Sequence, residues 1–156
     1  MAQQDMKKEN LITVRDVQID GWSDGDWSPI IKSVDLTLQK GQILGLIGES
    51  GAGKSTLGLA AMGFTRGGCR ISGGTIDFDG IDLRTASPNQ RRALRGKRIA
   101  YVAQSAAASF NPAHTLIKQH CEAPVQHCVM SRFDAQEDAK ALYERMRMPN
   151  PGEIGF

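Results

Sequence analysis

The most chemically specific stretch of this sequence is a run of small residues that ends in a lysine and two hydroxyl residues. It fits the spacing G-x-x-x-x-G-K-[ST], typical of a loop that wraps phosphate groups, and it reads Gly48-Glu49-Ser50-Gly51-Ala52-Gly53-Lys54-Ser55-Thr56. Glycines let successive backbone N–H groups turn toward a polyphosphate without side-chain clashes. Lys54 can then reach the β- and γ-phosphate oxygens, and the Ser55 hydroxyl can bind Mg²⁺. The spacing predicts a binding site for a nucleoside polyphosphate.

Such a loop requires a strand before it and a helix after it. Residues 43–47 form a short apolar run that predicts a buried strand, and residues 57–62 continue as a helix. The positive end of that helix would point at the bound anion. A glycine-rich turn can match the spacing by accident, but these flanking elements favour nucleotide binding over a chance match.

The other elements are predicted from apolar periodicity and from turn and cap residues. The polar, glycine-containing residues 21–29 predict a hairpin loop between the first two strands. Ser87-Pro88 fits a helix N-cap followed by a proline at the first helical position. Strands are predicted over 11–19, 30–39, 71–78 and 98–103, and helices over 88–95, 115–121 and 134–146.

Composition limits the classes of function. The chain has 156 residues, of which 40% are hydrophobic, and its formal net charge of +2 implies no strong field for nucleic acid. It contains no apolar stretch long enough to cross a bilayer, and its polar N-terminus lacks the apolar core of a secretory signal. Three irregularly spaced cysteines fit reduced thiols in a cytosolic protein better than disulfides.

Two further clusters are interpreted as structural. The basic residues within 91–98 could contact an anionic partner, but the solvated end of a short helix is the preferred interpretation. His120 and His127, each followed by a cysteine, look like metal ligands at first sight. On a helix they would lie about 10 Å apart, too far for one Zn²⁺ with ligand distances of about 2 Å, and Pro124 between them disturbs a helix.

The order of elements resembles the N-terminal half of an ATP-binding cassette (ABC) transporter subunit. The resemblance covers roughly residues 11–150 and rests on three blocks: 34–56, 74–83 and 99–104, where Gln104 matches the glutamine of the family's Q-loop. Within the family, Ser109-Phe110-Asn111-Pro112 is similar to a segment of oligopeptide, dipeptide and nickel importers. Ser105-Ala106 departs from the acidic residue and proline that many of those importers carry there.

This resemblance implies an α/β fold. The expected architecture is a P-loop NTPase core of the ABC ATPase type with an N-terminal antiparallel β hairpin and the start of a helical subdomain. Residues 11–104 would form the β-subdomain and P-loop core, and residues 105–150 would begin the helical subdomain. Together, residues 1–156 would be a partial ABC ATP-binding domain.

The resemblance also implies roles for individual residues. Residues 48–56 would bind the phosphates of ATP, with Lys54 neutralising charge on the γ-phosphate and Ser55 holding Mg²⁺. Gln104 would contact Mg²⁺ or the attacking water, so Lys54 and Gln104 are the candidate catalytic residues. The family stacks an aromatic residue on adenine near the end of the first strand. Trp22 is the first candidate and Trp27 the second, although either indole could simply pack against its loop.

The implied function is that of an ATP-binding subunit of an importer, with peptides as the favoured solute. Its partners would be ATP, a second ATP-binding subunit and transmembrane permease subunits, at the cytoplasmic face of the plasma membrane, and not nucleic acid. The sequence holds only the half with the phosphate loop and the Q-loop. No acidic strand end, signature segment or switch histidine follows, and Ser72-Gly73-Gly74 fits a turn better than a signature. We therefore expect a truncated chain that is inactive alone.

Two alternatives remain at this stage. A small P-loop kinase would suit the length, but its phosphate loop normally lies almost at the N-terminus, and no lid arginines or acceptor site can be identified here. A non-catalytic nucleotide-binding module would bind ATP without turnover.

Overall fold

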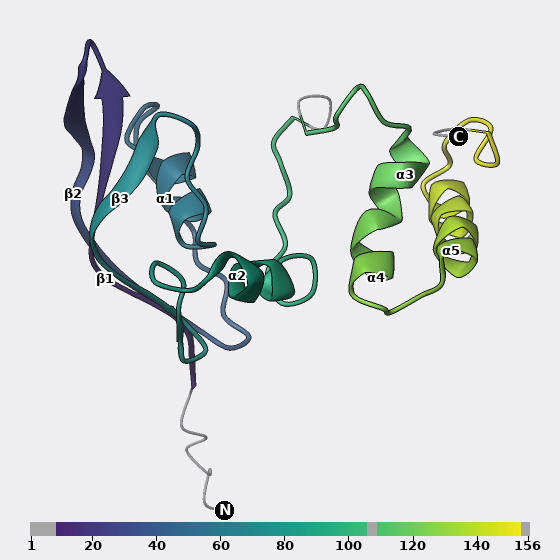
Figure 1. The fold of residues 1–156 in the computed structure, drawn as a ribbon, viewed down its shortest axis with the longest axis horizontal. Coiled ribbons are helices and arrows are strands. Elements are labelled where there is room, and N and C mark those ends of the chain that lie inside the picture. Colours follow the sequence, from purple (N-terminus) through teal and green to yellow (C-terminus); the bar gives the residue numbers. More distant parts are fainter. Residues whose placement is uncertain (1–8, 106–108, 154–156) are drawn as a thin grey trace, which may run out of the picture. The chain divides into compact units, whose positions relative to one another are not determined.

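The computed structural model describes residues 9–105 and 109–153, and its contacts divide the chain into two compact units, 1–91 and 92–156. The first unit contains the sheet and the helix that follows the phosphate loop (Figure 1). The second contains three of the helices, and a fourth, α2 (Pro88–Leu94), runs across the division. Among the described residues, no helix is long and apolar enough to cross a membrane.

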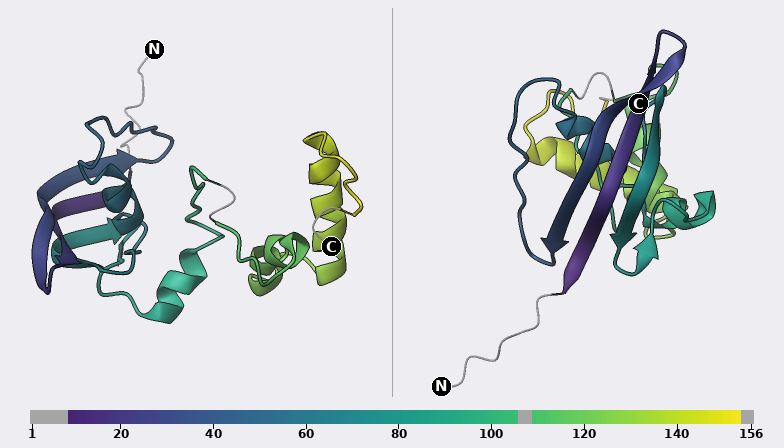
Figure 2. Two further views of the ribbon diagram at one scale, coloured as in Figure 1. Left: turned by 90° about the horizontal axis from the view of Figure 1, so that it is seen from above. Right: turned by 90° about the vertical axis from the view of Figure 1, so that its left-hand side faces the viewer.

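The first unit is built on a four-stranded antiparallel sheet with the strand order β2-β1-β3-β4. The three long strands lie side by side in the right-hand view of Figure 2. The strands are β1 (Asn10–Ser23), β2 (Asp26–Gln39), β3 (Cys69–Phe78) and β4 (Ile81–Asp82). The expected strands over 11–19, 30–39 and 71–78 therefore form, each somewhat longer than predicted.

The hairpin between β1 and β2 is tighter than the sequence suggested. Ser23 pairs with Asp26, so only Asp24 and Gly25 form the turn, and both have positive φ, 53° and 86°. Asp-Gly is a preferred pair for such two-residue hairpin turns, because its geometry matches the twist of the strands. The expectation of a loop over 21–29 was wrong, because most of these polar residues pair across the two strands.

The buried face of β1 changes phase at a bulge. Val14, Val17 and Ile19 are all almost fully buried, although strict alternation would place Val14 and Val17 on opposite faces. The register shifts between Val14 and Val17, where Asp16 has a φ of 46° and its backbone N–H donates to Asp35 Oδ1 at 2.7 Å. The extra residue brings both valines to the core.

Two segments that the sequence predicted as strands are not strands in the structure. Residues 43–47 lie in an irregular segment, where Ile43 and Ile47 are 96% and 99% exposed. In residues 98–103, only Ile99 makes a bridge, to Arg95, and Val102 is 92% exposed. A strand exists through hydrogen bonds to neighbouring strands. Neither segment joins a ladder within the described residues, so apolar character alone did not make them strands.

The helix that follows the phosphate loop is α1 (Lys54–Ala60), which buries Leu57 and Leu59. It confirms the expected helix, although it begins earlier and ends at Ala60. Helix α2 begins after Ser87, whose side chain accepts from the Gln90 N–H while Gln90 Oε1 accepts from the Ser87 N–H. This reciprocal cap confirms the expected start at Pro88.

The second unit packs α3 (Leu116–His120) and α4 (Glu122–Gln126) against α5 (Arg132–Arg145). Its small core consists of Ile117, Cys121, Ala135, Ala139 and Tyr143, with Met148 packed against it. Helix α5 begins earlier than predicted, because Ser131 and not Asp134 is its N-cap: the Ser131 hydroxyl accepts from the Asp134 N–H at 3.1 Å.

Candidate nucleotide-binding site

The loop of residues 48–56 closes on its own lysine. Lys54 is the first residue of α1, and its side chain turns back so that Nζ donates to the Gly48 carbonyl at 2.8 Å and to the Glu49 carbonyl. These carbonyls stand at the opposite end of the loop. The ammonium group therefore joins the two ends of the loop through its own hydrogen bonds.

Gly53 is required by the geometry at the junction of loop and helix. Its φ is +81°, a conformation that residues with a Cβ rarely adopt. A Cβ at this position would lie 3.2 Å from Cγ1 of Ile31, on the neighbouring strand. The Gly53 carbonyl accepts from the Leu57 N–H at 2.8 Å and so begins the helix.

The remaining loop residues face outward. Glu49, Ser50, Gly51, Ala52 and Ser55 are all exposed, and Thr56 is half-buried. The Ala52 N–H donates to the Glu49 carbonyl at 3.3 Å, which tightens the middle of the loop. An exposed Ser55 hydroxyl, one residue after Lys54, is accessible to a metal ion that accompanies a bound phosphate, as the residue pattern requires.

A pocket of about 340 Å³ lies beside the loop within the first unit. It is lined by Ala52, Gly53, Lys54 and Leu57 from the loop and helix, by Leu46 and Ile47, and by residues 30–34 of β2. That β2 forms this wall could not be predicted from the sequence, because residues 30–34 carry no motif and only the fold brings them close to the loop.

The two tryptophans face each other across the β1–β2 hairpin. Trp22 pairs with Trp27, and their rings meet edge to face with centroids 5.2 Å apart. Trp22 is 52% exposed, whereas Trp27 is half-buried and the guanidinium carbon of Arg70 lies 4.2 Å from the centroid of its ring. The indole with the more accessible surface is therefore Trp22.

Ile30 connects the tryptophan end of the hairpin to the phosphate loop. A Cβ on Gly21 would lie 2.7 Å from Ile30 Cδ1, and a Cβ on Gly53 would lie 3.5 Å from Ile30 Cγ2. One isoleucine side chain thus reaches both the residue before Trp22 and the last glycine of the loop. This contact joins Gly21 to Gly53, and the approach of the Trp22 ring to the loop stays a prediction.

The other candidate residues lie elsewhere. Gln104 is exposed and belongs to the second unit, so its part at the phosphate loop stays a prediction. Ser72-Gly73-Gly74 lies within β3 and not in a turn, and a Cβ on Gly74 would overlap the carbonyl oxygen of Asp16 in the bulge. The rings of His120 and Tyr143 meet edge to face, and His127 Nε2 lies 2.7 Å from the Arg95 carbonyl oxygen.

Comparison with known proteins gives consistent matches. Residues 31–153 match the family described as ABC transporter. The metal-staphylopine import system ATP-binding protein of Staphylococcus aureus is 39% identical over 137 residues, which cover 87% of this chain and 48% of that protein. A probable peptide ABC transporter ATP-binding protein of Sinorhizobium fredii is 31% identical, covering 96% and 45%.

A third relative is the dipeptide transport ATP-binding protein of Escherichia coli, which is 32% identical over 81% of this chain and 40% of its own length. The chain therefore spans about half the length of the curated relatives that it matches.

Proposed function

Since this chain belongs to the ABC transporter family, we propose that it is the ATP-binding part of an importer's ATPase subunit and that residues 48–56 hold the phosphates of Mg·ATP. The family consists of P-loop ATPases that normally use ATP with Mg²⁺. The observation that carries the proposal is Lys54, whose ammonium group already lies across the loop on the Gly48 and Glu49 carbonyls. A phosphate oxygen is a stronger acceptor for an ammonium group than a neutral carbonyl, because the contact is between two charges.

The residues of the loop then have separate tasks. Backbone N–H groups of the loop would hold the phosphate oxygens, and Lys54 would neutralise the charge that builds up on the γ-phosphate. Ser55, exposed on the first turn of α1, would bind Mg²⁺, which supplies further neutralisation of the phosphates when it is present. Gln104 would contact the metal ion or position the attacking water, and Trp22 would stack on the adenine.

The names of the relatives support a proposal for the transported solute and the partners. Peptide and dipeptide transport stand in the names of two relatives and metal-staphylopine import in that of a third, which supports a peptide or a similar small solute. The partners would be a second ATP-binding subunit and membrane permease subunits, which would place the protein at the inner face of the plasma membrane.

Binding at the loop is tested with Lys54→Ala. Removing a charge-assisted contact, at about 1.5–3 kcal/mol, should weaken Mg·ATP binding by about tenfold or more in an equilibrium titration. Lys97→Ala is the matched control, because it removes the same charge from an exposed position outside the loop. Equal affinities in wild type and Lys54→Ala would rule out the proposed site.

Turnover is a separate prediction. We expect the 156-residue chain to bind ATP without hydrolysing it, because the sequence holds the phosphate loop but no segment that matches the family's acidic strand end or signature. Positioned charges around the attacking water supply most of the catalysis of phosphoryl transfer. A phosphate-release assay should therefore show no Mg²⁺-dependent hydrolysis. Hydrolysis that disappears in Lys54→Ala would instead favour a small kinase or a self-sufficient ATPase.

A further inference from the structure

Four side chains from three strands meet at the tip of the sheet in the first unit. Trp22 pairs with Trp27 across β1 and β2, and Asp20 pairs with Arg70 across β1 and β3. Asp20 and Trp22 are two residues apart on β1, so they lie on the same face of the sheet. Two indoles, a carboxylate and a guanidinium group therefore form one cluster.

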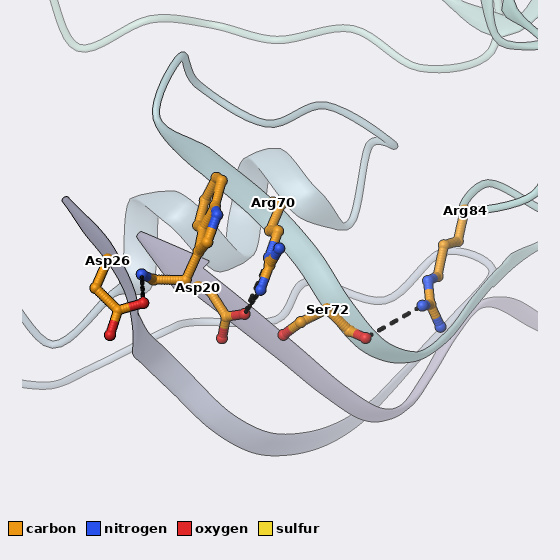
Figure 3. Close-up of polar contacts among 6 residues, drawn as sticks. Asp20, Asp26, Arg70, Ser72 and Arg84 are labelled. Carbon is orange, nitrogen blue, oxygen red and sulfur yellow. Dashed lines mark hydrogen bonds and ion pairs between the residues drawn. The ribbon is translucent and has the colours of Figure 1, made fainter. Parts of the chain in front are cut away.

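Arg70 is held from two sides in this cluster. Its Nε and one terminal nitrogen each donate to Asp20 Oδ2 at 3.1 Å, as Figure 3 shows for the ion pair. Its guanidinium carbon lies 4.2 Å from the centroid of the Trp27 ring, a distance at which a cation is attracted to an aromatic face. The Asp20 side chain is only 17% exposed, so the anchor of this arginine is itself well packed.

This arrangement distinguishes the two tryptophans. The guanidinium group of Arg70 covers one face of Trp27, and Trp27 meets Trp22 edge to face. The main chain of Trp22 is held as well, because its backbone N–H donates to the Gly68 carbonyl at 2.7 Å. Trp22 remains 52% exposed, so its ring is accessible to a ligand.

We propose that Arg70 is a positioning residue for the base of the nucleotide, an inference that rests on the nucleotide binding proposed above. By pairing with Asp20 and covering Trp27, it fixes the indole against which Trp22 packs. Trp22 then presents a ring of set orientation to the adenine. Arg70 touches neither the phosphates nor the reacting atoms, so its loss should weaken only those ligands that carry a base.

The test compares two probes, Mg·ATP and magnesium tripolyphosphate, which has the phosphates but no base. Their affinities are measured by equilibrium titration of the purified chain. Arg70→Ala should weaken Mg·ATP binding by about three- to fivefold and leave tripolyphosphate binding unchanged. Lys54→Ala should weaken both probes. Asp20→Asn, which removes the other half of the ion pair, should change the ratio of affinities in the same direction as Arg70→Ala.

Arg84→Ala is the matched control. Arg84 also lies beside β3, but it donates to the Gly74 carbonyl at 2.7 Å and not to the tryptophan cluster. It also donates to the Ser72 carbonyl at 3.2 Å (Figure 3). Its loss should leave the ratio of the two affinities as in wild type.

The proposal is overturned if Arg70→Ala leaves both affinities unchanged, lowers both equally, or changes the ratio no more than Arg84→Ala does. In each of these cases, Lys54-dependent binding of the two probes by wild type would leave the proposed function standing. If wild type binds neither probe, the nucleotide site fails, and the role of Arg70 fails with it.

Discussion

At the scale of single residues, the candidate phosphate-binding residues could be predicted from their spacing in the sequence alone. The order of glycines, Lys54 and Ser55 identified the candidate loop, because few backbones other than a phosphate loop need that order. The roles of the two tryptophans could not be separated in the same way. What distinguishes Trp22 from Trp27 is Arg70, which is distant in sequence and reaches the ring only through the pairing of β1 with β3.

Trp22 should report on the bound base. Stacking of adenine on an exposed indole changes the surroundings of that indole, so Mg·ATP should change the tryptophan fluorescence of the chain, measured at submicromolar protein. Trp22→Ala should abolish the change. Trp27→Phe, which keeps an aromatic ring beneath Arg70, should retain most of it. A change that survives in Trp22→Ala and disappears in Trp27→Phe would reverse the two roles.

At the scale of elements, helix caps could be predicted from the sequence where only one nearby residue suits the capping position. The start of α2 followed from Ser87-Pro88, and its reciprocal cap with Gln90 forms as expected. The start of α5 was placed too late, because Ser131 and Asp134 are both good caps and sequence alone does not rank them. Residues 43–47 were predicted as a strand, because an apolar run records a tendency to be buried and not the presence of a neighbouring strand.

Helix α5 carries a pH-dependent element of stability in the second unit. Burial, and secondarily the nearby Cys121, raise the pKa of Tyr143 above its usual value of about 10. A raised pKa means that the folded chain holds the phenol proton more tightly than the unfolded chain does. The contribution of Tyr143 to the free energy of unfolding is therefore complete below about pH 10, and it is lost as the pH rises through the pKa of the folded chain.

Urea unfolding, followed by the helical circular dichroism signal at about pH 9 and about pH 11, should show this loss in wild type. Tyr143→Phe should reduce the difference between the two pH values, while Tyr101→Phe, at an exposed tyrosine, should not. Lys40, whose pKa is raised mainly by its hydrogen bond to Glu9, also loses its contribution at alkaline pH, but in the first unit. The prediction would be contradicted if wild type and Tyr143→Phe lost the same free energy of unfolding between the two pH values.

At the scale of the whole molecule, the notable property is how much apolar surface the chain leaves uncovered. Ile43 and Ile47 are almost fully exposed on either side of Leu44 and Leu46, which are 43% and 44% exposed. Contiguous apolar patches of this kind mark either an interface or a tendency to aggregate. The sequence predicted that residues 43–47 would be buried, and their composition still favours burial against some other surface.

We therefore expect the 156-residue chain to self-associate through residues 43–47. Light scattering after gel filtration should show an apparent mass that rises with concentration, and heating should give a broad transition. Ile43→Ser should reduce the association, because this side chain is 96% exposed and does not line the pocket beside the phosphate loop. Val129→Ser removes an exposed apolar side chain from the second unit and should have little effect. A monomeric chain with a sharp, reversible transition would contradict this view.

The contacts of Lys54 also have a kinetic consequence. Its ammonium group is already bound to the Gly48 and Glu49 carbonyls, so a nucleotide does not meet an unoccupied positive charge. If Lys54 binds the nucleotide as proposed, the γ-phosphate would have to replace two backbone acceptors, and Lys54 would have to leave them before the final complex forms. Association is then a collision followed by a rearrangement. The observed rate constant should level off at high nucleotide concentration, at the frequency with which Lys54 leaves its own loop.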